Sequence, residues 1–263
     1  MKTYKDIFAT RDKAALIPFF VLGDPDYKTS LAVIKTAIDA GADILELGIP
    51  FSDPIADGPT IQKADIRALK AGMTCEKALD LIREIKAYAD IPIGLLMYYN
   101  LIYHHGRDRF YGDAAAAGVN SVLIADLSID DADEILPITK QVGMDTVFMV
   151  TPITAPQRKQ DIADKTTGFI YTVSLLGVTG TRDQVSGSVE GLVQEIKAIT
   201  DMPVCVGFGV SSPDHAKSIA QAGADGVIIG SKIVGLIEAH LDKKEELLQA
   251  VGQFIRDVRA ALS

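Results

Sequence analysis

A single glutamate, Glu46, interrupts an apolar segment near the start of the chain, residues 43–48, which reads DILELG. In a β-strand successive side chains point to opposite faces, so Leu45 and Leu47 share one face and Glu46 lies on the other. The leucine face suits packing against helices, which turns Glu46 toward the inside of a barrel. Burial there raises the pKa of a carboxyl into the working range of a general acid or base. Glu46 is therefore a candidate catalytic residue, and the alternative is a structural glutamate paired with a lysine or arginine elsewhere.

A loop with two aspartates follows this segment. Residues 49–60 read IPFSDPIADGPT, which puts Asp53 and Asp57 ahead of a helix predicted at residues 60–71. Asp57 could cap that helix, with Pro59 in its first turn, and Asp53 could form a turn with the proline after it. A second carboxylate beside Glu46 could instead share the acid and base work. The sequence leaves both interpretations of Asp57 open.

Glycines follow the last three expected strands, as GVTG at residues 177–180, GFG at 207–209 and GS at 230–231. In barrels of alternating strands and helices, phosphate binds to the loops after the final strands and to a helix N-terminus. Three such turns favour a phosphate site, with Ser231 as an N-cap and phosphate donor, although glycine could simply end each strand. The stretch 174–187, rich in Gly, Thr and Ser, is interpreted as a flexible lid.

The other reactive residue types point away from metal and covalent chemistry. His104 and His105 fall in an expected loop after residue 97 and are interpreted as surface or interface residues. No group of His, Cys, Asp and Glu has metal-ligand spacing, so we expect no metal site. Cys205 lies inside an apolar segment and is expected to be an inert core thiol. No serine lies on a GxSxG elbow and no lysine lies in a strand, which argues against a serine hydrolase and a Schiff-base aldolase.

The elements that must position these side chains alternate along the whole chain. Short runs rich in Val, Ile, Leu and Phe, typical of parallel strands buried on both faces, occur at residues 16–21, 43–47, 93–97, 121–125, 146–150, 169–173, 204–207 and 226–229. Amphipathic helices are predicted between them, at residues 30–40, 75–89, 107–117, 131–141, 189–200 and 213–222. The strand spacing of roughly thirty residues is that of a strand–helix–strand unit.

This alternation predicts an α/β protein that is one closed (β/α)8 TIM barrel rather than an open doubly wound sheet. The turns at residues 40–43, 117–120 and 222–225 each place a glycine at the end of a helix and lead into a strand. We expect a leading helix at residues 1–10 and a closing helix at 243–262. No linker or change of composition divides the chain, so residues 1–263 are expected to form a single domain.

The composition limits the possible partners. The chain has 263 residues and a formal net charge of −9, which argues against nucleic acid and against an anionic membrane surface. An anionic small ligand stays open, because backbone amides bind phosphate whatever the net charge. The two cysteines indicate no disulfide framework, and no signal peptide or membrane span is evident. We therefore expect a cytoplasmic protein.

Residues 45–59, LELGIPFSDPIADGP, closely resemble the signature of the tryptophan synthase alpha subunit family. The resemblance extends over nearly the whole chain, in order, through FFVLGDP at 19–25, MYYN at 97–100, ADL at 125–127, GVTG at 177–180, GFG at 207–209 and GS at 230–231. It implies a lyase of tryptophan biosynthesis that cleaves indole-3-glycerol phosphate to indole and D-glyceraldehyde 3-phosphate, a retro-aldol reaction that needs no cofactor in this chain.

The resemblance also implies a role for individual residues. Glu46 would carry the proton transfers, and Asp57 would accept the indole N–H as positive charge develops on the ring. Thr179 in the lid would bond to Asp57 when the site closes over substrate. The further residues that it implies in substrate binding, around the indole, the side chain and the phosphate, are Phe19, Ile61, Leu96, Tyr98, Asp126, Tyr171, Gly180, Phe208, Gly209, Gly230 and Ser231.

By the same resemblance, the partner is a tryptophan synthase beta subunit in an α2β2 complex. The beta subunit would hold pyridoxal phosphate and receive indole through a tunnel, for condensation with L-serine to L-tryptophan. The partner face of this chain would include the loop 51–59 and the segment 100–106.

Three alternatives remain open on sequence alone. The chain could be a stand-alone lyase that releases free indole, or an idle barrel kept to bind and activate its partner. The third alternative is a different phosphosugar enzyme, because phosphate loops do not identify the organic part of a substrate.

Overall fold

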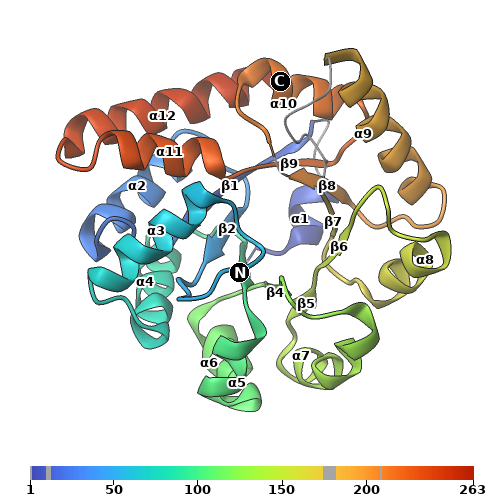
Figure 1. The fold of residues 1–263 in the computed structure, drawn as a ribbon, viewed down its shortest axis with the longest axis horizontal. Coiled ribbons are helices and arrows are strands. Elements are labelled where there is room, and N and C mark those ends of the chain that lie inside the picture. The colour runs from blue at the N-terminus through green and yellow to red at the C-terminus, as the bar shows by residue number, and fades with distance from the viewer. Residues whose placement is uncertain (1, 10–12, 174–181, 208) are drawn as a thin grey trace.

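The computed structural model describes residues 2–9, 13–173, 182–207 and 209–263, with the backbone alone for residues 182–188. Parallel strands form the wall of a barrel and helices surround it (Figure 1). The α/β barrel expected from the alternation of strands and helices is confirmed.

The barrel wall is one parallel sheet. Its strands are β1 (Ala15–Val21), β2 (Leu45–Gly48), β3 (Ile93–Met97), β4 (Ser121–Ile124), β5 (Asp145–Thr146), β6 (Phe148–Val150), β7 (Ile170–Val173), β8 (Val204–Gly207) and β9 (Gly226–Ile229). They lie in the order β5-β4-β3-β2-β1-β9-β8-β7-β6. Since β1 pairs with both β2 and β9, the first and last strands of the chain are neighbours, as a barrel requires.

The fifth predicted strand, residues 146–150, is divided in the structure. β5 pairs with β4, β6 pairs with β7, and only Val147 separates β5 from β6. The chain therefore changes partners at Val147, whose buried side chain points into the barrel with Tyr171 and Leu123. Eight runs were predicted where the described residues form nine strand segments, because a change of pairing within one apolar run leaves no mark on its composition.

The helix α1 (Tyr4–Ala9) precedes the first strand and packs with the inner cluster through Tyr4 and Ile7. The other helices surround the barrel: α2 (Tyr27–Asp39), α3 (Pro59–Lys70), α4 (Cys75–Tyr88), α5 (Tyr99–His105), α6 (Arg107–Ala117), η1 (Ile129–Glu134, a 3-10 helix), α7 (Leu136–Val142), α8 (Pro156–Lys165), α9 (Arg182–Lys197), α10 (Pro213–Gln221), α11 (Ser231–Ala239) and α12 (Lys244–Ala261). The expected leading and closing helices are α1 and α12. The helix predicted at 131–141 is replaced by η1 and α7, which meet at Ile135.

The region predicted as a lid, residues 174–187, is partly helical. α9 begins at Arg182 rather than at residue 189, so residues 182–187 of this stretch are helical, and their role as part of a lid stays a prediction. Residues 174–181 lie outside the described residues.

Two hydrophobic clusters confirm the inward and outward faces of the strands. Leu45 and Leu47 belong to the larger cluster, with buried side chains of the surrounding helices such as Leu81 and Val251. Ile44 belongs to a smaller cluster inside the barrel. The period-two reading of this segment therefore gave the correct face to each of its residues.

The turns between helices and strands have the conformation expected of them. Gly41, Gly118 and Gly223 all have positive φ, between 93° and 109°. Left-handed backbone of this kind favours glycine, since a side chain there would be strained. The repeated turn therefore serves the fold.

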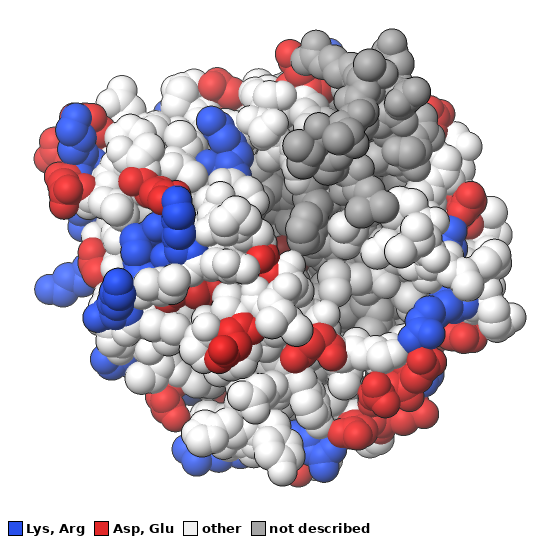
Figure 2. All heavy atoms as spheres, in the orientation of Figure 1, with Lys and Arg blue, Asp and Glu red and all other residues white. Residues whose placement is uncertain are grey.

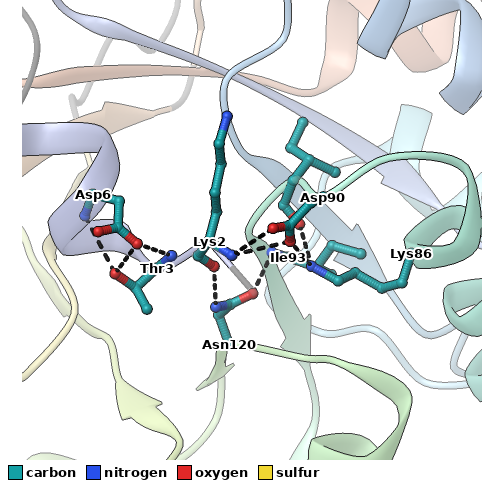
Figure 3. Close-up of polar contacts among 8 residues, drawn as sticks. Lys2, Thr3, Asp6, Lys86, Asp90, Ile93 and Asn120 are labelled. Atoms are coloured by element: carbon teal, nitrogen blue, oxygen red, sulfur yellow. Dashed lines mark hydrogen bonds and ion pairs between the residues drawn. The ribbon is translucent and has the colours of Figure 1, made fainter.

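The N-terminal segment is held at one of these turns (Figure 3). The backbone N–H of Lys2 donates to both carboxylate oxygens of Asp90, at 3.0 and 3.1 Å. The Asn120 side chain donates to the Lys2 carbonyl at 3.0 Å and accepts from the Ile93 N–H at 2.9 Å. Asn120 thus joins the N-terminus, β3 and the start of β4, next to α1, whose Tyr4 and Ile7 pack in the inner cluster.

Side-chain bonds also hold the closing helix α12 to the barrel. α12 lies along α2, α10 and α11 (Figure 1). Its Arg259 donates to Asp43 at 2.6 Å and to the Ala14 carbonyl at 3.3 Å, and Asp43 also accepts from the Leu16 N–H at 2.8 Å. One buried carboxylate therefore links α12, β1 and the residues that precede β2.

On the face drawn in Figure 2, basic side chains mix with acidic ones around the rim, and no continuous basic surface forms on the part that the structure describes. None of the described helices is long and apolar enough to span a membrane.

Candidate active site

Glu46 lies inside the barrel on β2, with its side chain almost fully buried at 4% exposure. Its neighbours in the sheet are Phe19 on β1 and Gly94 on β3. Burial, together with the negative charge of Asp57, raises the pKa of Glu46 from 4.5 to about 8. No lysine or arginine of the described ranges forms an ion pair with Glu46, so the alternative of a structural ion pair finds no support there. The group can hold a proton at neutral pH.

Asp57 lies in the loop between β2 and α3 and is held by Tyr98. The Tyr98 hydroxyl donates to the Asp57 carboxylate at 2.6 Å and accepts from the Ala56 N–H at 3.0 Å. The Phe51 ring stacks on the Tyr98 ring, with centroids 5.1 Å apart and planes 29° apart. Both ends of the loop therefore contact one tyrosine at the end of β3.

The proposed cap role of Asp57 is wrong. The N-cap of α3 is Gly58, no side chain bonds to the first turn, and Pro59 occupies its start. Burial raises the pKa of Asp57, and the bond from Tyr98 offsets part of this rise by stabilising the carboxylate. The Asp57 carboxylate is thus held by Tyr98 rather than by the helix, and its role as a second catalytic carboxylate stays a prediction.

Phe19 lies beside Glu46 in the sheet, on the neighbouring strand β1. Its ring packs between two glycines, and a Cβ at Gly48 would lie 2.9 Å from the ring tip, while one at Gly230 would lie 3.2 Å from the ring. Phe19 is 5% exposed. These two glycines therefore make room for the ring that faces the site.

Tyr171 on β7 lies against Gly207 on β8. A Cβ at Gly207 would overlap the Tyr171 hydroxyl, so this glycine sets the depth to which the tyrosine reaches. Burial and the nearby Glu46 charge raise the pKa of the Tyr171 hydroxyl well above its ordinary value. Tyr171 is therefore a neutral group near Glu46 that can donate a hydrogen bond.

The inner cluster contains side chains that the sequence reasoning did not select. Leu123, Met149 and Val173 pack with Leu96 and Tyr171 inside the barrel. They alternate along their strands with residues of the outer cluster, such as Val122 and Val150. The same period-two reading that found Glu46 could have found them. Ile61, by contrast, is buried on α3 in the outer cluster.

Asp126 follows β4 and bonds to backbone. Its carboxylate accepts from the Tyr99 N–H at 2.7 Å, at the first residue of α5. The bond ties the loop after β4 to the start of α5. The substrate contact that the resemblance implies for Asp126 stays a prediction.

The expected phosphate site is described in part. Gly209 follows β8 with a φ of 74°. Gly230 is the N-cap of α11 and Ser231 its first residue, so the prediction of Ser231 as the cap is off by one position. The first N–H groups of a helix lack intrahelical partners, which suits an anion. Thr179, Gly180 and Phe208 lie outside the described residues.

The two adjacent histidines lie on α5 and not in a loop. His105 has only 5% of its side chain exposed and bonds to Asp113 at 2.9 Å, so it is not a surface residue, and the alternative of an interface residue stays a prediction. Cys205 is fully buried, as expected. The described residues hold no group of His, Cys, Asp and Glu suited to a metal ion.

Comparisons with known proteins agree along the whole chain. The family model described as "Tryptophan synthase alpha chain" matches residues 7–263. The tryptophan synthase alpha chain of Methanothermobacter thermautotrophicus is 47% identical over 98% of this chain and 96% of its own length. A crystal structure of tryptophan synthase subunit alpha from Legionella pneumophila superposes with a TM-score of 0.91 at 31% identity, covering 100% of this chain and 98% of that one. A chain from the tryptophan synthase α2β2 complex of Pyrococcus furiosus superposes with a TM-score of 0.87 at 39% identity, covering 94% and 98%.

Proposed function

The chain belongs to the tryptophan synthase alpha chain family, and we propose that Glu46 and Asp57 carry its lyase reaction, the cleavage of indole-3-glycerol phosphate to indole and D-glyceraldehyde 3-phosphate. The observation that carries the assignment is the position of the Glu46 carboxyl, buried inside the barrel beside Asp57, with a pKa of about 8. A carboxyl with that pKa is protonated at neutral pH and can still give up its proton.

The reaction needs two proton transfers and one charge to be stabilised. Protonated Glu46 gives its proton to carbon 3 of the indole, and the ring nitrogen takes the positive charge. Asp57 accepts the N–H of that nitrogen, an interaction that is stronger in the charged transition state than in the substrate. The Glu46 carboxylate then removes the hydroxyl proton of the side chain while the bond to carbon 3 breaks and a carbonyl forms. Glu46 ends protonated, ready for another turnover.

The rest of the site binds and orients the substrate. Leu96 and Tyr171 belong to the inner cluster and Phe19 pairs with Glu46, so we assign these three side chains to the indole and the reacting side chain; Tyr98 holds Asp57. Ile61 and Phe208 are assigned to the indole pocket, and Asp126 and Thr179 to polar contacts, through the resemblance alone. The phosphate is assigned to the backbone of Gly209, Gly230 and Ser231, with Gly180.

The partner in this proposal is a tryptophan synthase beta subunit in an α2β2 complex. The support on this chain is apolar exposure along the expected face, where Ile55 is 83% exposed and Tyr103 69%. The pyridoxal phosphate of the full synthase reaction is assigned to that partner, since the steps derived for this chain are proton transfers alone. We place the complex in the cytoplasm.

Turnover of indole-3-glycerol phosphate by the full chain, alone and with a beta subunit, tests this proposal. We expect indole and glyceraldehyde 3-phosphate in equal amounts and a higher rate with the beta subunit. No indole under either condition would contradict the lyase assignment. Full activity alone with no stimulation would contradict the complex and favour a stand-alone lyase.

A further inference from the structure

The helix α1 lies across one end of the barrel, within the ring of strands in Figure 1. Its Tyr4 is 2% exposed and belongs to the inner cluster, although α1 precedes the first strand. The Tyr4 ring meets the Phe169 ring edge to face, with centroids 5.3 Å apart. Its hydroxyl shares a hydrogen bond of 2.7 Å with the Ser121 hydroxyl on β4. The mechanism derived above leaves this buried tyrosine without a role.

The hydroxyl of Tyr4 lies in the same layer of the barrel as Glu46. Glu46 on β2 is the register partner of Gly94 on β3. Gly94 is in turn the partner of Ser121 on β4, the residue that bonds to Tyr4. Partner residues on neighbouring parallel strands share a face of the sheet and lie about 5 Å apart. A Cβ at Gly94 would lie 2.7 Å from the Tyr4 hydroxyl, so this oxygen occupies the place of the side chain that the glycine lacks, next to Glu46.

On its other side, Tyr4 lines an open cavity of about 780 Å³. The lining also includes Asp145, Gly168 and Asp225, which lie at or just before the starts of β5, β7 and β9. The cavity therefore opens at the end of the barrel where the strands begin, opposite the loop that follows β2. A Cβ at Gly168 would lie 3.1 Å from the Tyr4 ring, so the ring packs closely on the backbone there. Tyr4 thus stands between this cavity and the layer that contains Glu46.

We propose that Tyr4 is a positioning residue for the lyase reaction, whose ring closes the barrel beneath Glu46 and keeps solvent in the open cavity from reaching the Glu46 carboxyl. The inference rests on the proposed function of Glu46. A carboxyl that is shielded from water holds its proton more tightly, because its charged form loses solvation. Tyr4 acts in this way through Glu46 and does not need to touch the substrate.

The charges around Glu46 leave this role to burial. Burial is the larger cause that raises the pKa of Glu46 to about 8, and the negative charge of Asp57 adds to it. Tyr171 on β7 and Cys205 on β8 belong to the inner cluster with Tyr4. Burial raises the pKa of all three of these groups well above their ordinary values, so they are neutral when the enzyme works. Tyr4 therefore acts on Glu46 by excluding water and not by charge.

Two substitutions separate the ring from its hydroxyl. Tyr4→Phe keeps the ring and loses the bond to Ser121, whereas Tyr4→Ala removes the ring and opens the layer of Glu46 to the cavity. We expect the pKa of Glu46 to fall in Tyr4→Ala and to hold in Tyr4→Phe.

The pH profile of the lyase reports this change. Protonated Glu46 starts the reaction, so kcat/KM falls as the pH rises above the pKa of Glu46 in the free enzyme. The ratio of wild type to Tyr4→Ala in kcat/KM should rise about tenfold between about pH 6 and about pH 9. The same ratio for Tyr4→Phe should stay constant within about twofold. Titrations of other groups are common to these proteins and cancel in the ratio.

Tyr111→Ala is the matched control. Tyr111 is also a fully buried tyrosine, but it lies on α6 in the outer cluster. Its removal makes a cavity away from Glu46, so a general loss of stability would affect both alanine variants, while only Tyr4→Ala should change the ratio with pH. The assays use the full chain with its beta subunit, and thermal melts confirm that each variant folds. Tyr4→Val, a smaller truncation, takes the place of Tyr4→Ala if that variant does not fold.

A ratio of wild type to Tyr4→Ala that stays constant with pH would overturn the proposal. An equal rise of the ratio in Tyr111→Ala would also overturn it, because the effect would then follow from lost packing in general.

A second measurement does not depend on turnover. In infrared difference spectra, the band of the protonated Glu46 carboxyl is identified by its absence from Glu46→Gln. It should disappear with a midpoint near pH 8 in the wild type and at a lower pH in Tyr4→Ala. If the wild type lacks lyase activity but both titrations are seen, the function assigned to Glu46 fails while the shielding by Tyr4 stands. If the wild type is active and the two midpoints are equal, the role of Tyr4 fails alone.

Discussion

Glu46 and Asp57 are both carboxyl groups, and their surroundings separate their roles. Glu46 is buried in the barrel with no hydrogen-bonding cation among the described residues, so its neutral form is favoured. Asp57 receives a hydrogen bond of 2.6 Å from Tyr98, which favours its charged form. Two carboxyls whose pKa values are pushed apart can serve as proton donor and charge stabiliser in one site.

The contact between Tyr171 and Gly207 gives a first prediction. Gly207→Ala would put a methyl group where the Tyr171 hydroxyl lies, and a ring cannot move aside as a flexible chain end can. We expect kcat/KM for indole formation to fall by about 10- to 100-fold through displacement of Tyr171. Gly112→Ala is the control, since a methyl group there meets nothing within 4 Å. An active Gly207→Ala enzyme with unchanged KM would show that Tyr171 does not matter for the reaction.

The raised pKa of Glu46 should also appear in stability. The unfolded chain releases this proton near pH 4.5, while the folded protein keeps it to about pH 8. Within that window the folded state binds more protons, so the free energy of unfolding falls as pH rises, with a slope approaching about 1.4 kcal/mol per unit. Glu46→Gln removes this slope. In urea unfolding from about pH 5 to about pH 8, the free energy of unfolding of the variant should rise relative to that of the wild type as the pH rises. Parallel curves would mean that Glu46 ionises normally in the fold.

Sequence alone predicts some residues of the site and not others, for a physical reason. Glu46 was placed correctly because strand alternation fixes the face of every residue in β2. The role of Asp57 stayed open because the donor that engages it, Tyr98, lies 41 residues away, just after β3. The burial of Asp65 on α3 gave no signal either, since an aspartate is usually exposed to solvent.

Among the helices and strands too, those set by local sequence were predicted, and those stabilised by distant residues were not. α6 has the predicted bounds, while α5 was expected to be loop. The residue before α5, Tyr98, offers no side-chain cap, and the bond to the first helical N–H comes from Asp126, 27 residues away. Helix starts that are stabilised by another part of the chain leave no local signal. α9 likewise begins within a stretch rich in Ser and Gly. The weak helix propensity of these residues predicted a later start than the structure has.

The ion pair between Arg67 and Asp24 gives a prediction at this scale. It joins α3, which carries Asp65, to the turn after β1, and the Asp24 side chain is fully buried. Burial raises the pKa of Asp24 more than Arg67 lowers it, so removal of Arg67 would leave a costly buried acid. We expect Arg67→Ala to lower the free energy of unfolding by about 3 kcal/mol or more in urea titrations.

Arg83→Ala is the control for this substitution. Arg83 forms an exposed pair with Asp80 at 2.6 Å, within α4. Its removal should change stability by less than about 1 kcal/mol. Equal effects of Arg67→Ala and Arg83→Ala would contradict a structural role for the buried pair.

At the scale of the whole molecule, the terminal elements complete the barrel. The bonds of Lys2 to Asp90 and Asn120 hold the N-terminus, and Arg259 holds α12. These hydrogen bonds and ion pairs join distant parts of the chain. The alternation of strands and helices therefore predicted the barrel but not these bonds. We propose that the chain unfolds as a single domain.

The proposed partner face gives a prediction for the assembly. Ile55 is 83% exposed at the tip of the loop that carries Asp57, where a beta subunit would cover it. Ile55→Asp should weaken binding to a beta subunit by about tenfold or more and reduce stimulation of the lyase, since it buries a charge. Sedimentation of mixtures measures the complex. Leu241→Asp, between α11 and α12 and 41% exposed, is the matched control. Equal binding of the beta subunit by both variants would show that the face around Ile55 is not the binding site.

The most direct test of the account is indole formation by Glu46→Gln in complex with a beta subunit. The amide keeps the shape of the side chain and removes the proton that the mechanism moves twice. We expect kcat to fall by about a thousandfold or more, with binding of indole-3-glycerol phosphate retained. A variant whose kcat stays within about tenfold of wild type would contradict the assignment of Glu46 as the group that transfers the protons.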